Sequence, residues 1–173
     1  KGKSFSIIST LPLCKYTNIL LIDCDLPYFD YFDQVILGIQ KNFDLVCINR
    51  RSKKSVVINE NLNNYQKTRF ILGNLIGKLI NLFLKIDLEG TDTQAGLKAF
   101  KKEKDFKKLN FNSKKYFFDL ELIYYFRKNQ KKILSIPVKY KIAKESNIKI
   151  FSIKNFYILY EFFKIVFILK FLK

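Results

Sequence analysis

The sequence predicts an α/β protein in which a mostly parallel sheet is flanked by helices. Residues 18–22 are a short aliphatic run that ends in charge at Asp23, as a buried parallel strand does at a sheet edge. Residues 31–41 follow with apolar side chains at helical spacing, and residues 43–48 return to a short buried run. A strand, a helix and a strand on this scale predict a right-handed parallel crossover.

Composition bounds the class of protein. The chain has 173 residues, of which 49% are hydrophobic and 27% charged, so it can bury the core of about one domain. Its formal charge is +17, which implies anionic partners unless it reflects only a general excess of Lys. The absence of His excludes His-dependent acid–base catalysis, Ser-His-Asp triads and His-ligated zinc. The Cys residues, 3 in number, match no metal or redox spacing and favour a reducing compartment.

The middle of the chain is predicted to be a loop followed by a long helix. Residues 49–64 lose apolar periodicity and gain charge, which is typical of a loop. Residues 65–86 form a helix with a wide apolar surface, in which Gly73 and Gly77 allow close backbone approach. This helix is too polar to span a membrane, so we expect it to pack in the core or to lie in a membrane interface.

The following residues are predicted to complete the sheet. Residues 90–100 are predicted to be a turn that leads into a short strand, and residues 101–108 are predicted to be a basic connector. Residues 117–128 carry apolar side chains on one helical face. Apolar and polar side chains alternate over residues 133–140, which predicts an edge strand. Pro137 marks an edge or a bulge in it.

The last stretch is predicted to be an amphipathic helix at a membrane surface. Residues 153–172 are apolar and aromatic and approach the ~20 residues that a span needs. Four charged residues interrupt them and favour a surface helix, with a span whose lysines snorkel as the alternative: Lys154, Glu161, Lys164 and Lys170. We therefore divide the chain into a domain of residues 1–150 and a membrane-proximal helix within residues 151–173.

Asp23 and Asp25 form the first candidate site. They stand just past the predicted strand 18–22, where ligands of open α/β sheets collect. Two carboxylates at this spacing can share one divalent cation, and their oxygen ligands suit Mg²⁺ or Mn²⁺. A solvated acidic turn is the alternative, because this pair is common on its own.

Further motifs follow in an order that resembles a known family. Residues 91–100 read Thr-Asp-Thr-Gln-Ala-Gly-Leu-Lys-Ala-Phe, residues 118–122 read Phe-Asp-Leu-Glu-Leu, and residues 136–138 read Ile-Pro-Val. Together with Asp23-Cys24-Asp25-Leu26-Pro27, they resemble the family 2 glycosyltransferases that load a sugar onto a polyprenyl phosphate. The likeness is greatest to the dolichyl-phosphate β-glucosyltransferases, and Asp-Thr-Gln-x-Gly-x-Lys-x-Phe is its most specific part.

The resemblance implies a GT-A-like, Rossmann-like fold, and it covers the chain to about Val138. It places residues 1–3 in a loop that lies mid-domain in the family, so the chain would lack the first strands and much of the nucleotide-binding half. It also implies a helix over residues 3–15, which Pro12 should break early.

The implied reaction is transfer of a sugar, expected to be glucose, to a polyprenyl or dolichyl phosphate with inversion. The donor would be a nucleotide sugar, UDP-glucose above all, and the cofactor Mg²⁺ or Mn²⁺ held by Asp23 and Asp25. Asp92 would orient the acceptor or act as a base, although a structural cap would give the same sequence. Contacts to the donor or acceptor phosphates would come from Arg50, Arg51, Arg69, Gln94 and Lys98. For Arg50 and Arg51, a solvated basic loop is the alternative.

Such an enzyme is expected at the cytoplasmic face of a membrane, which is the endoplasmic reticulum in a eukaryote or the plasma membrane in a bacterium. Two alternatives remain open. One is a non-enzymatic basic module for nucleic acid or anionic membranes, suggested by the +17 charge and the 16% aromatic content. No recognised nucleic-acid motif supports it, so nucleic acid is not expected as a partner. The other is an inactive, truncated glycosyltransferase.

Overall fold

The computed structural model describes residues 2–103, 111–143 and 156–172. It shows an α/β protein with a mixed sheet, so the predicted class is confirmed. The chain forms two compact units, each built from two segments. The first unit contains Lys1–Ile48 and Thr93–Ile136, and the second contains Asn49–Asp92 and Pro137–Lys173.

A four-stranded sheet with the order β1-β4-β2-β5 forms the centre of the first unit. Its strands are β1 (Asn18–Ile22), β4 (Leu97–Lys101), β2 (Leu45–Asn49) and β5 (Ile133–Pro137). All of β2 is buried, as its apolar sequence predicts. β5 lies at an edge of the sheet and ends at Pro137, which confirms the predicted edge position.

The prediction of a mostly parallel sheet is wrong, because β4 runs antiparallel to both of its neighbours. β1 and β2 are parallel to each other, but β4 lies between them. The reason is the place from which β4 starts. The amide of Asp23, just past the end of β1, donates to the carbonyl of Gly96, so β4 begins where β1 finishes and must run back.

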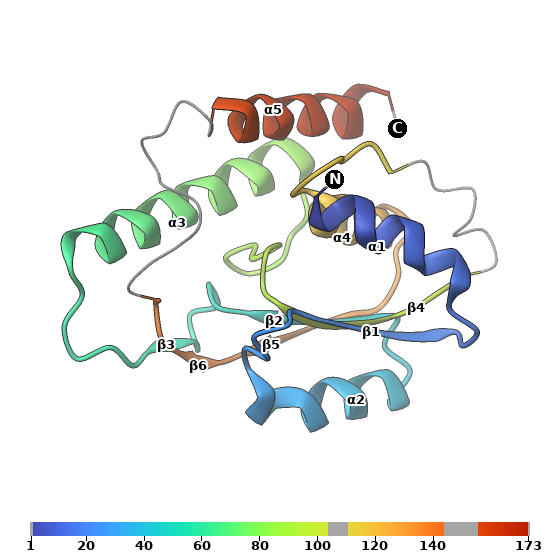
Figure 1. The fold of residues 1–173 in the computed structure, drawn as a ribbon, viewed down its shortest axis with the longest axis horizontal. Coiled ribbons are helices and arrows are strands. Elements are labelled where there is room, and N and C mark those ends of the chain that lie inside the picture. The colour runs from blue at the N-terminus through green and yellow to red at the C-terminus, as the bar shows by residue number, and fades with distance from the viewer. Residues whose placement is uncertain (1, 104–110, 144–155, 173) are drawn as a thin grey trace. The chain divides into compact units, whose positions relative to one another are not determined.

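Helices cover both faces of this sheet (Figure 1). Helix α2 (Phe32–Gln40) lies on one face, and α1 (Lys3–Thr10) and α4 (Phe118–Lys128) lie on the other. Helix α2 buries Val35 and Ile39, in agreement with the predicted helical spacing. As predicted, the first helix is short: a 3₁₀ turn with Pro12 follows α1, and a second 3₁₀ turn over Phe29–Tyr31 precedes α2.

The second unit contains two helices and a small parallel sheet. Helix α3 (Asn64–Leu84) begins with a capping box between Asn63 and Gln66. Helix α5 (Phe156–Phe171) lies along α3 (Figure 1). Strands β3 (Val56–Val57) and β6 (Lys139–Tyr140) pair in parallel. The sequence predicted only a loop over residues 49–64, and it predicted residues 133–140 as one strand rather than as β5 and β6.

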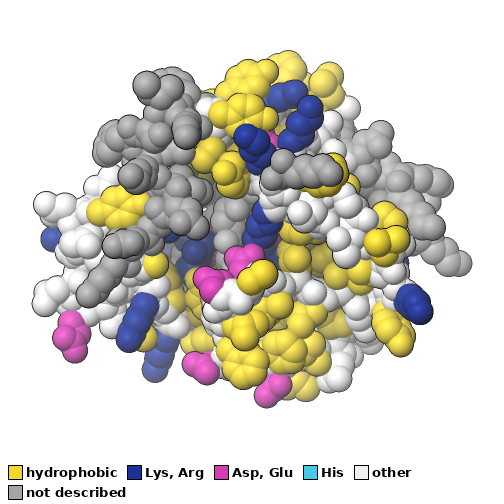
Figure 2. Space-filling view, in the orientation of Figure 1, with side chains coloured by type: hydrophobic (Ala, Val, Ile, Leu, Met, Phe, Trp, Pro, Cys, Tyr) yellow, Lys and Arg dark blue, Asp and Glu magenta, His cyan; other side chains and the backbone are white. Residues whose placement is uncertain are grey.

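Among the described residues, no helix is long and apolar enough to cross a membrane. Helix α5 nevertheless exposes many large apolar side chains, and Figure 2 shows hydrophobic side chains gathered over this helix with basic ones beside them. Parts of the predicted connector 101–108 and of the predicted helix 153–172 lie outside the described residues.

Candidate active site

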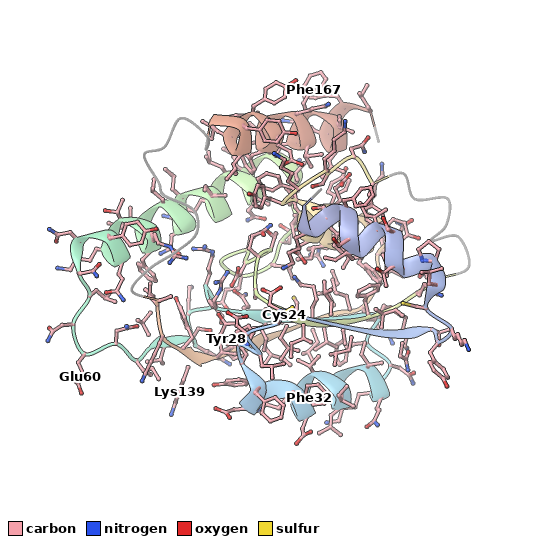
Figure 3. The ribbon with its side chains drawn as sticks, viewed as in Figure 1. Cys24, Tyr28, Phe32, Glu60, Lys139 and Phe167 are labelled. Atoms are coloured by element: carbon pink, nitrogen blue, oxygen red, sulfur yellow. The ribbon has the colours of Figure 1, made fainter. Side chains whose placement is uncertain are left out.

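The loop that carries Asp23 and Asp25 follows the end of β1 in the first unit, as predicted (Figure 3, where Cys24 is labelled). Asp25 is exposed, and the side chain of Asp23 is 37% exposed. In this loop, Leu26 and Tyr28 adopt positive φ angles of 48° and 66°. Such backbone strain costs about 1–3 kcal/mol per residue and is concentrated at functional sites.

Asp23 is held against the segment that carries the most specific part of the family resemblance. Its amide donates to the carbonyl of Gly96 at 2.8 Å. A Cβ atom on Gly96 would lie 2.4 Å from Asp23 Oδ2, so only glycine lets the carboxylate approach this closely. The pairing of Ile22 with Leu97 extends the contact into the sheet. Two motifs that are far apart in the sequence therefore meet at the end of β1.

A chain of alternating charges extends from Asp23 into the interior. Lys3 Nζ lies 2.7 Å from Asp23 Oδ1 and 3.7 Å from Asp119 Oδ2. Burial by itself would lower the pKa of Lys3, but the carboxylates of Asp119 and Asp23 outweigh burial and raise this pKa above its usual value. Lys3 therefore remains an ammonium at neutral pH.

Lys98 completes this chain of charges. Its ammonium lies 2.5 Å from Asp119 Oδ1 and donates to the carbonyl of Ala95 at 2.9 Å. The side chains of Lys98 and Asp119 are each 1% exposed. Removing either partner would leave a buried charge without its partner, which typically costs about 3–5 kcal/mol. In this position Lys98 neutralises Asp119, and its ammonium has no exposed surface for a phosphate.

Glu121 has a structural position in α4. Its buried carboxylate accepts hydrogen bonds from the backbone amides of Asn112 at 2.8 Å and Ser113 at 2.8 Å. It therefore fastens the segment before α4 to the helix.

In the second unit, Asp92 is bound to Arg50. Arg50 Nε and Nη2 donate to the two carboxylate oxygens of Asp92 at 2.6 and 2.8 Å, and the Arg50 amide donates at 3.0 Å. Burial alone would raise the pKa of Asp92, but the charge and hydrogen bonds of Arg50 outweigh burial and lower it to about 2. The carboxylate is therefore ionised at neutral pH and is a poor general base. Its geometry suits it to position Arg50.

Arg51 is packed against helix α3. Its Nη1 donates to Asn74 Oδ1 at 2.7 Å, and a Cβ atom on Gly73 would lie 2.4 Å from Nη2. One turn further along, a Cβ atom on Gly77 would lie 2.8 Å from the carbonyl oxygen of Gly90. The prediction that Gly73 and Gly77 allow close approach is confirmed, and at Gly73 the group that approaches is a guanidinium.

Arg69 stands one helical turn before Gly73 on the same stripe of α3. Its guanidinium lies over the ring of Tyr65, 5.8 Å from the ring centroid. Arg69 Nη1 is buried and has no hydrogen-bond partner in the part of the chain that the structure describes. A buried charged donor without an acceptor is costly, so this group can gain more from an anion than the paired Arg50 can.

The predicted site residues are divided between the units. Asp23, Asp25, Gln94 and Lys98 belong to the first unit, and Arg50, Arg51, Arg69 and Asp92 belong to the second. Gln94 is exposed. Sequence reasoning missed Lys3 and the buried pairing of Lys98 with Asp119. No local pattern marks such long-range charge pairs, although Asp119 and Lys98 both stood in the motifs of the resemblance.

If a divalent ion such as Mg²⁺ or Mn²⁺ binds at this loop, Asp23 and Asp25 would hold it, because Mg²⁺ commonly takes one or two carboxylates and completes its shell with water and substrate phosphates. The contact with the Lys3 ammonium shows that Asp23 already accommodates a cation. No group of three or more His, Cys, Asp and Glu residues that could hold a metal is present among the described residues. Such a site would therefore depend on oxygen atoms from the substrate.

Comparison with models of known protein families gives no match, and no curated protein matches the chain.

Proposed function

We propose that this chain acts in a metal-dependent glycosyltransferase with a GT-A-like fold, which moves a sugar from a nucleotide sugar to a polyprenyl or dolichyl phosphate. The observation that carries the proposal is the convergence of three separate motifs in the first unit. Gly96 packs against Asp23, and Lys3 links Asp23 to Asp119, which Lys98 holds from the other side. Motifs that serve one reaction are expected to meet in this way.

The proposed chemistry agrees with the residues that are present. A divalent ion on Asp23 and Asp25 would supply positive charge to the diphosphate leaving group. The acceptor is already a phosphate anion, so the reaction needs no strong general base. A sequence without His and an Asp92 with a pKa of about 2 both fit this requirement. UDP-glucose is the proposed donor, and transfer inverts the sugar carbon.

The arginines of the second unit are the proposed phosphate contacts. Arg50 is pre-oriented by Asp92, and Arg51 is fixed by Asn74. Guanidinium groups bind phosphate in a bidentate way that ammonium groups do not. Arg69, which is half-buried, is the third proposed phosphate contact. Gln94, which is exposed, remains a proposed contact to sugar or phosphate, whereas Lys98 supports the site through Asp119.

We also propose that the second unit rests on the cytoplasmic surface of a membrane, which is the endoplasmic reticulum or a bacterial plasma membrane. On α5, Tyr160, Phe163 and Phe167 are 64%, 51% and 56% exposed, and Lys164 and Lys170 are exposed beside them. Burying apolar surface contributes roughly 25 cal/mol per Å². Each lysine near an anionic leaflet adds about 1 kcal/mol. A lipid-linked acceptor would be presented at such a surface.

A sugar-transfer assay with UDP-glucose, a polyprenyl phosphate and Mg²⁺ tests the proposed function. The variant Asp23→Asn/Asp25→Asn should lose at least about 100-fold in rate, because loss of electrostatic stabilisation of this kind costs about 3 kcal/mol or more. The matched control is Asp30→Asn/Asp33→Asn, which removes the same charge from two exposed residues nearby in sequence. Equal rates in the two double variants would contradict the metal assignment, and no transfer by the wild type would contradict the reaction.

A further inference from the structure

Lys3 occupies an unusual position beside the proposed metal site. It is the first residue of α1, and its ammonium lies between two carboxylates, 2.7 Å from Asp23 Oδ1 and 3.7 Å from Asp119 Oδ2. Asp23 is the residue that would bind the divalent ion. The ammonium therefore stands where it neutralises the same charge that the metal would neutralise.

The carboxylate of Asp119 is a second group that the Lys3 ammonium can bind. Its Oδ1 atom is taken by Lys98, whereas its Oδ2 atom is buried and accepts no hydrogen bond within the described residues. At 3.7 Å the ammonium is just outside hydrogen-bond distance of this oxygen, so a shift of roughly 1 Å would complete the contact. Leaving Asp23 would consequently not leave Lys3 without a partner.

We propose that Lys3 is a tethered competitor of the divalent cation at Asp23. Without metal, the ammonium holds the Asp23 carboxylate. When a divalent ion binds Asp23, repulsion between the two cations moves the ammonium to Asp119 Oδ2. This inference rests on the proposed metal site, and it adds that the chain's own charge sets how tightly that site binds metal.

The arrangement also explains why both carboxylates are tolerated without metal. Asp23 and Asp119 carry two negative charges in one region, and Lys3 and Lys98 balance them. Because a divalent ion must displace Lys3, the site binds metal weakly until a further anion joins it. A substrate diphosphate would supply that anion.

The experiment is a titration of the full chain with Mn²⁺ alone, in which free Mn²⁺ is measured by electron paramagnetic resonance. The variants are Lys3→Met, Asp23→Asn and, as a control, Lys41→Met, which removes an exposed lysine just after α2. Lys3→Met should bind Mn²⁺ about five- to tenfold more tightly than the wild type, since it removes both the ion pair and a nearby like charge. Lys41→Met should change the affinity less than about twofold, because screening weakens distant charges.

The outcomes separate this inference from the proposed function. If Asp23→Asn abolishes Mn²⁺ binding but Lys3→Met binds like the wild type, competition by Lys3 is wrong and the metal site stands. If Asp23→Asn binds as tightly as the wild type, both ideas are wrong. If Lys41→Met raises the affinity for Mn²⁺ as much as Lys3→Met does, the effect is one of net charge, and the proposal that Lys3 competes with the metal is wrong.

A second measurement needs no substitution at Lys3. Acetic anhydride labels exposed lysines, and mass spectrometry reports the extent at each position. Saturating Mg²⁺ should lower the labelling of Lys3 several-fold, because the ammonium moves toward the buried Asp119, and should leave Lys41 unchanged. Unchanged labelling of Lys3 at a Mg²⁺ concentration that displaces bound Mn²⁺ would refute the movement.

Discussion

At the scale of single residues, most of the acidic side chains of the candidate site are held in ion pairs. Asp92 binds Arg50 through both carboxylate oxygens, and Asp119 binds Lys98 in the interior. Of Asp23, Asp92 and Asp119, Asp23 alone combines a charge partner with substantial exposure, since its side chain is 37% exposed and lies beside Lys3. Among these three acidic residues, Asp23 is consequently the one that can exchange its partner for a ligand.

The pairing of Asp92 predicts a specific dependence of stability on pH. Its pKa is about 2 in the folded chain and 3.8 ordinarily, so the pair stabilises the fold above pH 3.8 and this stability is lost as the pH falls toward 2. Asp92→Asn should lower the free energy of unfolding by about 2 kcal/mol at neutral pH. The difference between variant and wild type should shrink below pH 4, as measured by urea unfolding at several pH values. A difference that stays constant between neutral pH and pH 3 would show that the ion pair is not its cause.

At the scale of elements, the junction between β1 and β4 determines where the Asp23 carboxylate lies. Gly96→Ala places a Cβ atom 2.4 Å from Asp23 Oδ2 and should push that carboxylate away. We expect Mn²⁺ affinity to fall at least about tenfold, because metal sites tolerate little displacement of their ligands. Gly38→Ala is the control, since it crowds Val46 at 2.8 Å on the other side of the sheet. It should lower stability without weakening Mn²⁺ binding, and equal loss of binding in both variants would contradict the role of Gly96.

The extent to which these elements could be predicted follows from what determines each one. Residues 18–22 and the helix that follows carry their own apolar patterns, and the observed β1 and α2 agree with them. The direction of β4 is not encoded in its five residues, because it depends on the end of the sheet at which the preceding segment arrives.

The candidate site divides in the same way. Asp23 and Asp25 lie at the end of β1 because a strand pattern ends there, and that could be read from the sequence. The burial of Lys98 could not, since lysines are rarely buried and its partner Asp119 is 21 residues away. Lys3 belongs to no motif, and only the folded chain shows that its ammonium reaches Asp23.

At the scale of the whole molecule, the second unit combines charged and apolar surface. We expect the chain to bind vesicles that contain phosphatidylserine through α5. Phe163→Ser/Phe167→Ser should weaken binding by roughly thirtyfold, which corresponds to about 2 kcal/mol of lost apolar burial. The control Phe29→Ser/Leu37→Ser alters residues of the first unit that are 62% and 50% exposed, against 51% and 56% for the α5 pair. Co-sedimentation that responds equally to both double variants would contradict α5 as the lipid-binding element.

The central position of β4 has a consequence for the order in which the chain can fold. β1 and β2 both precede β4 in the chain, yet neither pairs with the other, because β4 separates them. Each strand must wait for residues 97–101, which leave the ribosome only after the whole first segment of the second unit, Asn49–Asp92. A long loop must close before these strands can pair, and its closure costs conformational entropy. The formation of the sheet is therefore non-local and slow. A nascent chain stopped before β4 would expose two unpaired apolar strands, and it would depend on chaperones until that one strand emerged.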